Sequence, residues 1–155
     1  MPGVAAAGAI TYQTVEAQLA GRTLRLYVIG FEPGRPGGPR RIAEGRGLGT
    51  SHFELLADRK SGLSLGETIR LGRNRFTVVG LVEDAMNSAG DPAVFVTLAD
   101  AMALQSALDP AAARVQAARG PVAGGTASVA AVVAQITPGA DVALLTATVR
   151  QWKHL

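Results

Sequence analysis

Cysteine is absent from this 155-residue chain, so neither a disulfide framework nor a thiolate metal site can form. Histidine is scarce. The only two are His52 and His154, and neither lies at metal-ligand spacing from a second histidine or a carboxylate cluster. We therefore predict no metal site and no bound cofactor. These absences leave the cellular compartment open.

Charge is also sparse. Charged residues make up 17% of the chain and the net charge is only +3, which gives little support for a nucleic-acid partner. Four arginines lie between residues 35 and 46, but this segment is rich in proline and glycine and Phe31 is its only nearby aromatic residue. A solvated loop is the expected structure, and we predict no nucleic-acid binding.

Long apolar runs are missing. The most apolar window, residues 127–136, is far shorter than the ~20 residues that a membrane-spanning helix needs. The first eight residues lack a basic leader and a long apolar segment, so they do not read as a secretory signal and are expected to form a linker.

Catalytic motifs are not found either. Ser51 precedes His52, but the strained Gly-x-Ser-x-Gly elbow of a hydrolase is missing there. Residues 45–51 lack the Gly-Lys-Ser/Thr ending of a phosphate loop, and the acids at 83, 84 and 91 lack the spacing of a calcium loop. We expect no catalytic residues. A small hydrolase or transferase stays open only if the fold assembles an acid/base cluster from distant positions.

What the chain does contain indicates a folded domain with many turns. Hydrophobic residues reach 48%, with 19 glycines and 8 prolines. The length allows one core or two small subdomains. We predict the α+β class, with a mixed or antiparallel β-rich domain and one or two helices. The expected strands cover residues 10–19, 23–31, 53–57, 68–71, 76–79, 127–136 as a buried strand, and 142–149 as a returning strand.

The clearest local pattern is a β-hairpin over residues 66–80. Ile69 and Leu71 alternate with polar residues, and Phe76 begins a second alternating run. Gly72 and Asn74 are predicted to reverse the chain with positive φ.

Helices are expected after the midpoint. Thr97 is the predicted N-cap of a helix over residues 98–108, with Asp100 completing a shortened capping box. The apolar side of this helix is expected to comprise Leu98, Met102, Leu104 and Leu108. A second, weaker helix is expected at 111–119. Residues 32–49 lack periodicity and are expected to form a long surface loop, held down by Ile42 and Leu48.

Four segments in order resemble the MacB-like periplasmic core domains of ABC transporter permeases, most closely the DevC-like branch. They are residues 23–34, residues 38–46, the hairpin with its flanks at 61–84, and residues 91–102. The resemblance extends over residues 23–108, and the residues that carry the family pattern are Gly30, Gly45, Gly66, Leu71, Phe76, Val79 and Gly80.

This resemblance implies a non-enzymatic extracytoplasmic domain over residues 1–155, with a second subdomain at 97–141 that is abbreviated after Asp141. It implies a location on the periplasmic side of the cell membrane. The implied partners are an adaptor (membrane fusion) protein, an exported substrate of unknown class and a cytoplasmic ATPase subunit, with a homodimer of the whole permease. Trp152 and Lys153 then suit a membrane interface, although an exposed chain end explains them equally well.

Contact with partners is expected at exposed loop tips on a rigid scaffold. The hairpin tip Arg73, Asn74 and Arg75 and the 32–49 loop are the candidates. A free-standing extracytoplasmic binding or adaptor module is the alternative function.

Overall fold

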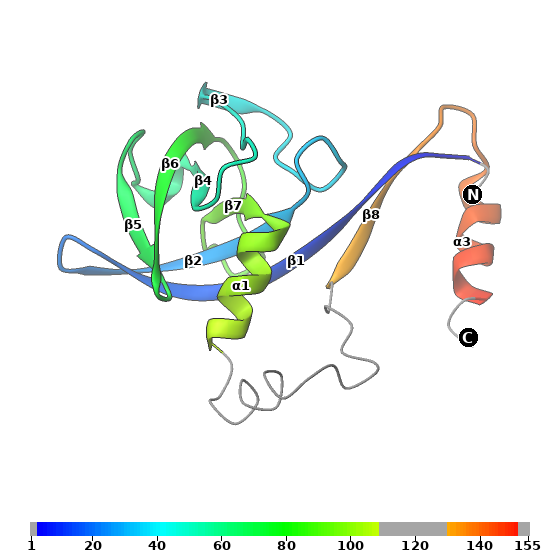
Figure 1. Ribbon diagram of the computed structural model, residues 1–155. Coiled ribbons are helices and arrows are strands. Elements are labelled where there is room, and N and C mark those ends of the chain that lie inside the picture. Colours follow the sequence, from blue (N-terminus) through cyan, green and yellow to red (C-terminus); the bar gives the residue numbers. More distant parts are fainter. Residues whose placement is uncertain (1–2, 109–129, 152–155) are drawn as a thin grey trace.

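The computed structural model describes residues 3–108 and 130–151 (Figure 1). Its elements in chain order are β1 (Val4–Leu19), β2 (Arg22–Phe31), β3 (Ile42–Gly45), β4 (Glu54–Asp58), the 3-10 turn η1 (Arg59–Ser61), β5 (Thr68–Leu71), β6 (Asn74–Val82), β7 (Ala93–Thr97), α1 (Leu98–Leu108), β8 (Ala131–Ile136) and α3 (Val142–Gln151). This is the predicted α+β class with a mixed β-sheet. Within these residues, no helix is long and apolar enough to cross a bilayer.

Six strands close on themselves in the order β1, β2, β7, β4, β6 and β5, and we call this ring the barrel. The β2–β7 and β4–β6 pairs are parallel, whereas the other pairs in the ring are antiparallel. Strand β3 pairs with β6 outside the ring. Closure removes the free edges that an open sheet of these six strands would expose.

Strand β1 belongs to two parts of the molecule. Its C-terminal half pairs with β2 in the barrel, from Ile10 opposite Phe31 to Leu19 opposite Arg22. Its N-terminal half pairs antiparallel with β8 and forms a two-stranded arm (Figure 1). The linker expected at residues 1–8 is therefore wrong from Val4 onward, because β8 supplies a pairing partner that lies over a hundred residues away.

The barrel interior is filled by the inward side chains of its strands. The strand predicted at 23–31 is confirmed as β2, on which the alternate residues Leu26 and Val28 are fully buried. Strands β4 and β7 are buried on both faces, which explains their continuous apolar runs. Their outward residues join a second, smaller cluster composed of Phe31, Leu56, Val82, Ala93 and Phe95.

The segment between β2 and β4 is more than a surface loop. It contains strand β3, so the prediction of an unstructured 32–49 loop is corrected. The structured part follows from backbone pairing with β6, which side-chain periodicity does not report. Leu48 packs against the second cluster as predicted, whereas Ile42 is exposed.

Both hairpins close through two-residue turns. Ala20 and Gly21 both have positive φ between β1 and β2, the requirement of a type I′ turn. Between β5 and β6 only Gly72 has positive φ, at 60°, which fits the first position of a type II′ turn. The expectation of positive φ at Asn74 is wrong, because Asn74 already pairs with Leu71 in the ladder.

Helix α1 closes one end of the barrel core. Thr97 caps it as predicted, accepting a 3.2 Å hydrogen bond from the Asp100 amide at its hydroxyl oxygen. The buried face differs from the prediction: it comprises Asp100, Ala101 and Leu104, while Leu108 is exposed. The small Ala101 lies against Gly30 of β2, so α1 packs on the barrel through the face that contains Ala101 and Leu104. The helix expected at 111–119 lies outside the described residues.

The C-terminal segment gives two corrections. Strand β8 exists, but the expected burial is wrong, since four of its six residues are exposed. Residues 142–149 are helical and not a returning strand. Asp141 accepts hydrogen bonds from the amides of Ala143 and Leu144 at 2.9 and 3.2 Å, an N-cap that starts α3. Between β8 and α3 the chain turns, with Gly139 at φ 84°.

Candidate functional site

The hairpin tip, residues 73–75, is solvent-accessible, whereas the strand residues next to it are buried. Arg73 and Arg75 are exposed and Asn74 is half-buried. Directly below them, Leu71 and Phe76 are almost completely buried in the barrel. Packing of this kind fixes the two strands, so the tip is a polar surface held by a rigid support.

Three of the family-pattern residues form one close crossing between β3 and β6. Gly45 pairs with Gly80 in the ladder. A Cβ atom on Gly45 would collide with the Val79 carbonyl oxygen, and one on Gly80 with the Arg46 carbonyl oxygen. The Arg46 amide also donates a 3.0 Å hydrogen bond to the Val79 oxygen. The absence of a side chain at Gly45 and Gly80 therefore lets the two backbones touch.

Two more pattern residues, Gly30 and Gly66, lie at close contacts or tight turns of the backbone. Gly30 faces helix α1, where a Cβ atom would collide with that of Ala101 and lie 2.8 Å from Thr11 Cγ2. Gly66 has φ of 78° in the turn before β5, and its amide donates to the Val78 oxygen at 2.8 Å.

The arginines of the 32–49 loop do not act as one basic patch. Arg46 donates two hydrogen bonds to the Glu54 carboxylate, one of them at 3.0 Å, and Arg35 lies 3.5 Å from Glu32. Hydrogen bonding from the Arg46 guanidinium holds the pKa of Glu54 below its usual range. Arg40 is exposed.

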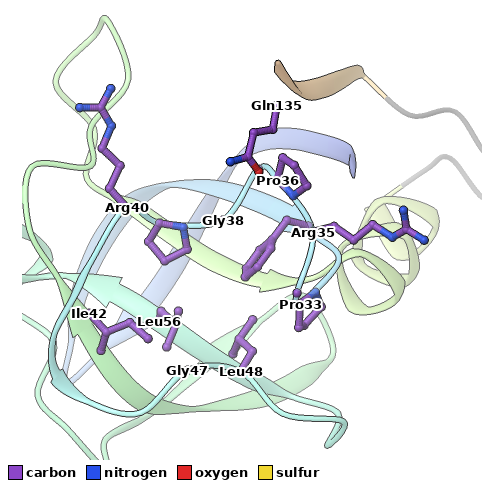
Figure 2. Close-up of a pocket in the computed structure, with 14 residues that line it drawn as sticks. Pro33, Arg35, Pro36, Gly38, Arg40, Ile42, Gly47, Leu48, Leu56 and Gln135 are labelled. Atoms are coloured by element: carbon purple, nitrogen blue, oxygen red, sulfur yellow. The ribbon is translucent and has the colours of Figure 1, made fainter. Parts of the chain in front are cut away.

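A cavity of about 670 Å³ lies between this loop and the second apolar cluster. Leu48 and Leu56 lie along one side of it, while Arg35 and Arg40 extend away from it in different directions (Figure 2). The cavity therefore has an apolar wall and a charged rim, but its polar groups do not converge on one point as they do in most small-molecule sites.

Folding brings together one pair that sequence spacing did not predict. His52 Nδ1 lies 2.8 Å from Asp100 Oδ1, across 48 residues of chain. The other carboxylate oxygen accepts a 2.9 Å hydrogen bond from the amide of Phe53, whose φ of 61° is unusual for a non-glycine residue. Asp100 is 3% exposed. Its carboxylate thus holds a strained loop residue against the start of α1.

This pair does not form a catalytic triad among the described residues, since no hydrogen bond joins Ser51 to His52 there. The acids considered for calcium are separated: Glu83 faces Arg59, Asp84 faces Lys60, and Asp91 faces Arg25. In residues 3–108 and 130–151, no three His, Asp or Glu side chains are grouped closely enough to hold a metal ion.

Comparisons with known proteins agree with the fold described above. Residues 1–152 match the family described as MacB-like periplasmic core domain. No curated protein matches. Among solved structures, the periplasmic region of MacB from Actinobacillus actinomycetemcomitans has a TM-score of 0.61 at 12% identity, covering 98% of this chain and 67% of that one.

Two further structures have the same fold. The extracellular domain of the noncanonic ABC-type transporter YknZ from Gram-positive bacteria has a TM-score of 0.63 at 13% identity, covering 95% of this chain and 71% of that one. A domain of a putative permease protein from Porphyromonas gingivalis has a TM-score of 0.59 at 18% identity, covering 99% and 65%. The family match and the barrel fold agree, and the chain belongs to the MacB-like periplasmic core domains of ABC transporter permeases.

Proposed function

We propose that this domain works on the extracytoplasmic side of the membrane, where it contacts an adaptor protein or the exported substrate and passes on the conformational change of the transporter. It acts without catalytic residues of its own. In this proposal ATP is hydrolysed by a separate cytoplasmic subunit, and the whole permease is a homodimer. Residues 97–141 are proposed to include a second subdomain, part of which lies outside the described residues.

The hairpin tip is the observation that carries this proposal. Arg73 lies in the turn between β5 and β6, and Arg75 lies on β6. The inward residues of these two strands are all at most 1% exposed: Ile69, Leu71, Phe76 and Val78. A force applied at such a tip moves the barrel as a body, because a close-packed core deforms little. A contact surface that transmits movement requires this combination of a polar end and a stiff base.

The 32–49 loop supports the proposal as a second contact surface. It is anchored by the β3–β6 ladder and by Leu48, but it presents Arg40 and Arg41 to solvent. Anchored loops with exposed polar residues are common positions for partner contact.

Site-specific crosslinking tests the proposal directly. The 155 residues contain no cysteine, so a single thiol can be placed by Arg73→Cys without further changes in this domain. The matched control is Ser88→Cys, an exposed position in the loop after the other end of β6. Each variant, in the full permease, carries a short photoreactive maleimide and is illuminated in cells that also make the adaptor.

We expect a crosslink from position 73 to the adaptor or to substrate, and a much weaker one from position 88. Equal yields from both positions would indicate random collision, and the absence of any product at 73 would contradict partner contact at the tip.

A further inference from the structure

Helix α3 is held in place with little packing. It has ten residues, and none of them is buried. Isolated helices shorter than ~12 residues are marginal in water, and most gain their stability by burying an apolar face. Val142, Leu145 and Val149 give α3 such a face, at spacings of three and four residues. Within the described chain, Leu145 is half-buried, whereas Val142 and Val149 remain 56% and 51% exposed.

A groove of about 790 Å³ lies between that face and the arm. From the arm, Val132, Ala134 and Ile136 of β8 line the groove, and Val132 is 65% exposed. In Figure 1, α3 lies at the far end of the arm, away from the barrel. The groove shares no lining residue with the hairpin tip or with the 32–49 cavity, and its size suits a small ligand.

In the part of the chain that the structure describes, two polar side chains line the groove, both from α3. The Thr146 hydroxyl donates a 2.8 Å hydrogen bond to the Val142 carbonyl, so it is already satisfied within the helix. Among residues 3–108 and 130–151, Arg150 is the only charged residue that lines the groove, and no carboxylate of these residues pairs with it. The site thus combines an apolar channel with one positive charge in the last helical turn.

We propose that this groove binds a single-chain amphiphile with an anionic head group, with the chain between α3 and β8 and the head group on Arg150. Arg150 is exposed at the edge of the groove, so a wholly apolar occupant would leave its positive charge without a counter-ion. An anionic head group supplies charge-assisted hydrogen bonds instead. Burial of the amphiphile's alkyl chain packs the part of the α3 face that the described residues leave exposed. This inference goes beyond partner contact and does not depend on it.

Calorimetric titration of the 155-residue chain tests the proposal, with decanoate below its micelle concentration and decanol as the uncharged probe. We expect saturable binding of one decanoate, about tenfold tighter than decanol, since a hydrogen bond to a charged group contributes at least that factor. Arg150→Gln is expected to remove this preference while decanol binding persists.

Neighbouring leucines provide a matched pair. Leu145 lines the groove, whereas Leu144 is 67% exposed and does not line it. Leu145→Gln is expected to weaken decanoate binding and Leu144→Gln to leave it unchanged. Ala134→Phe fills the groove from β8 without touching the helix sequence, so it is expected to block binding even if Leu145→Gln disrupts α3. Circular dichroism before titration reports whether the helix is retained.

Four results would overturn the proposal. The first is the absence of saturable heat with decanoate, and the second is equal binding of decanoate and decanol. The third is that decanoate does not bind but the chain cosediments with phosphatidylcholine vesicles, and Leu145→Gln abolishes this cosedimentation. The fourth is a dimer in sedimentation velocity that Ala134→Phe dissociates. The third would assign the groove to a bilayer surface, and the fourth to a second copy of the chain.

Discussion

Gly30 lies where strand β2 comes closest to helix α1. Gly30→Ala would place a Cβ atom against Ala101 and Thr11, both of which are buried. Neither neighbour is a flexible side chain that can move aside. Overpacking of this kind costs about 1–3 kcal/mol, so we expect a loss of that size in the free energy of unfolding, measured by urea denaturation.

Gly49→Ala is the control for this substitution. Its Cβ would meet only the end of the Arg46 side chain, at 4.0 Å, and its φ is not in the left-handed region. We expect a change within about 0.5 kcal/mol, as for other surface substitutions. If both variants lose the same stability, close packing at Gly30 is not the cause.

The Arg46–Glu54 pair predicts a pH dependence. The hydrogen bonds from Arg46 lower the pKa of Glu54 in the folded chain, so the carboxylate stabilises the fold above the unfolded-state pKa. That contribution is lost as the pH falls through the lowered folded-state pKa. We expect Arg46→Gln to raise the pKa of Glu54, followed by NMR titration of its side-chain carboxyl carbon.

Arg59→Gln is the control for Arg46→Gln. Arg59 is also a half-exposed arginine, but it faces Glu44 and Glu83. This substitution is expected to leave the titration of Glu54 unchanged. A Glu54 pKa that does not respond to Arg46→Gln would show that another group holds it low.

Residue chemistry alone could not predict the His52–Asp100 pair. The sequence suggested Asp100 as half of a capping box, because the spacing from Thr97 is the usual one. In the structure its carboxylate serves His52 and Phe53 instead. The tertiary fold decides which groups the Asp100 carboxylate binds, since His52 and Phe53 lie 48 and 47 residues away in the sequence.

At the scale of elements, α1 closes the barrel through one large side chain. Leu104 is 2% exposed, whereas Leu108, one turn later, is 52% exposed. Leu104→Ala is expected to cost about 2–5 kcal/mol, the usual range for a buried leucine. Leu108→Ala should change stability by less than about 0.5 kcal/mol. Thermal or urea unfolding measures both, and a large effect at Leu108 with none at Leu104 would contradict the observed face of the helix.

Elements with strong local signals were predictable from the sequence. The hairpin at residues 66–80 carries its alternation and turn glycine within fifteen residues, and β2 shows the same pattern. The 142–149 segment is the instructive failure. Its valines and threonines favour a strand, whereas Asp141 supplies an N-cap and the apolar residues also repeat at spacings of three and four. The segment therefore carries both a strand signal and a helix signal.

For the whole molecule, the sequence predicted the family and the class of fold but not how the barrel closes. Closure depends on pairings between distant strands, such as Gln18 with Arg70 and the parallel contact of β2 with β7. The arm likewise depends on β8 meeting β1 across most of the chain. Long-range pairings of this kind leave no periodic trace in either strand.

The central claim at this scale is that the domain lies outside the cytoplasm. A membrane-impermeant maleimide applied to spheroplasts measures this directly, with the exposed position of Ser88→Cys in the cysteine-free domain as the target, in a permease that has no other cysteine. Labelling before any permeabilisation is the predicted result. Labelling only after the membrane is opened would place the domain in the cytoplasm and contradict the account.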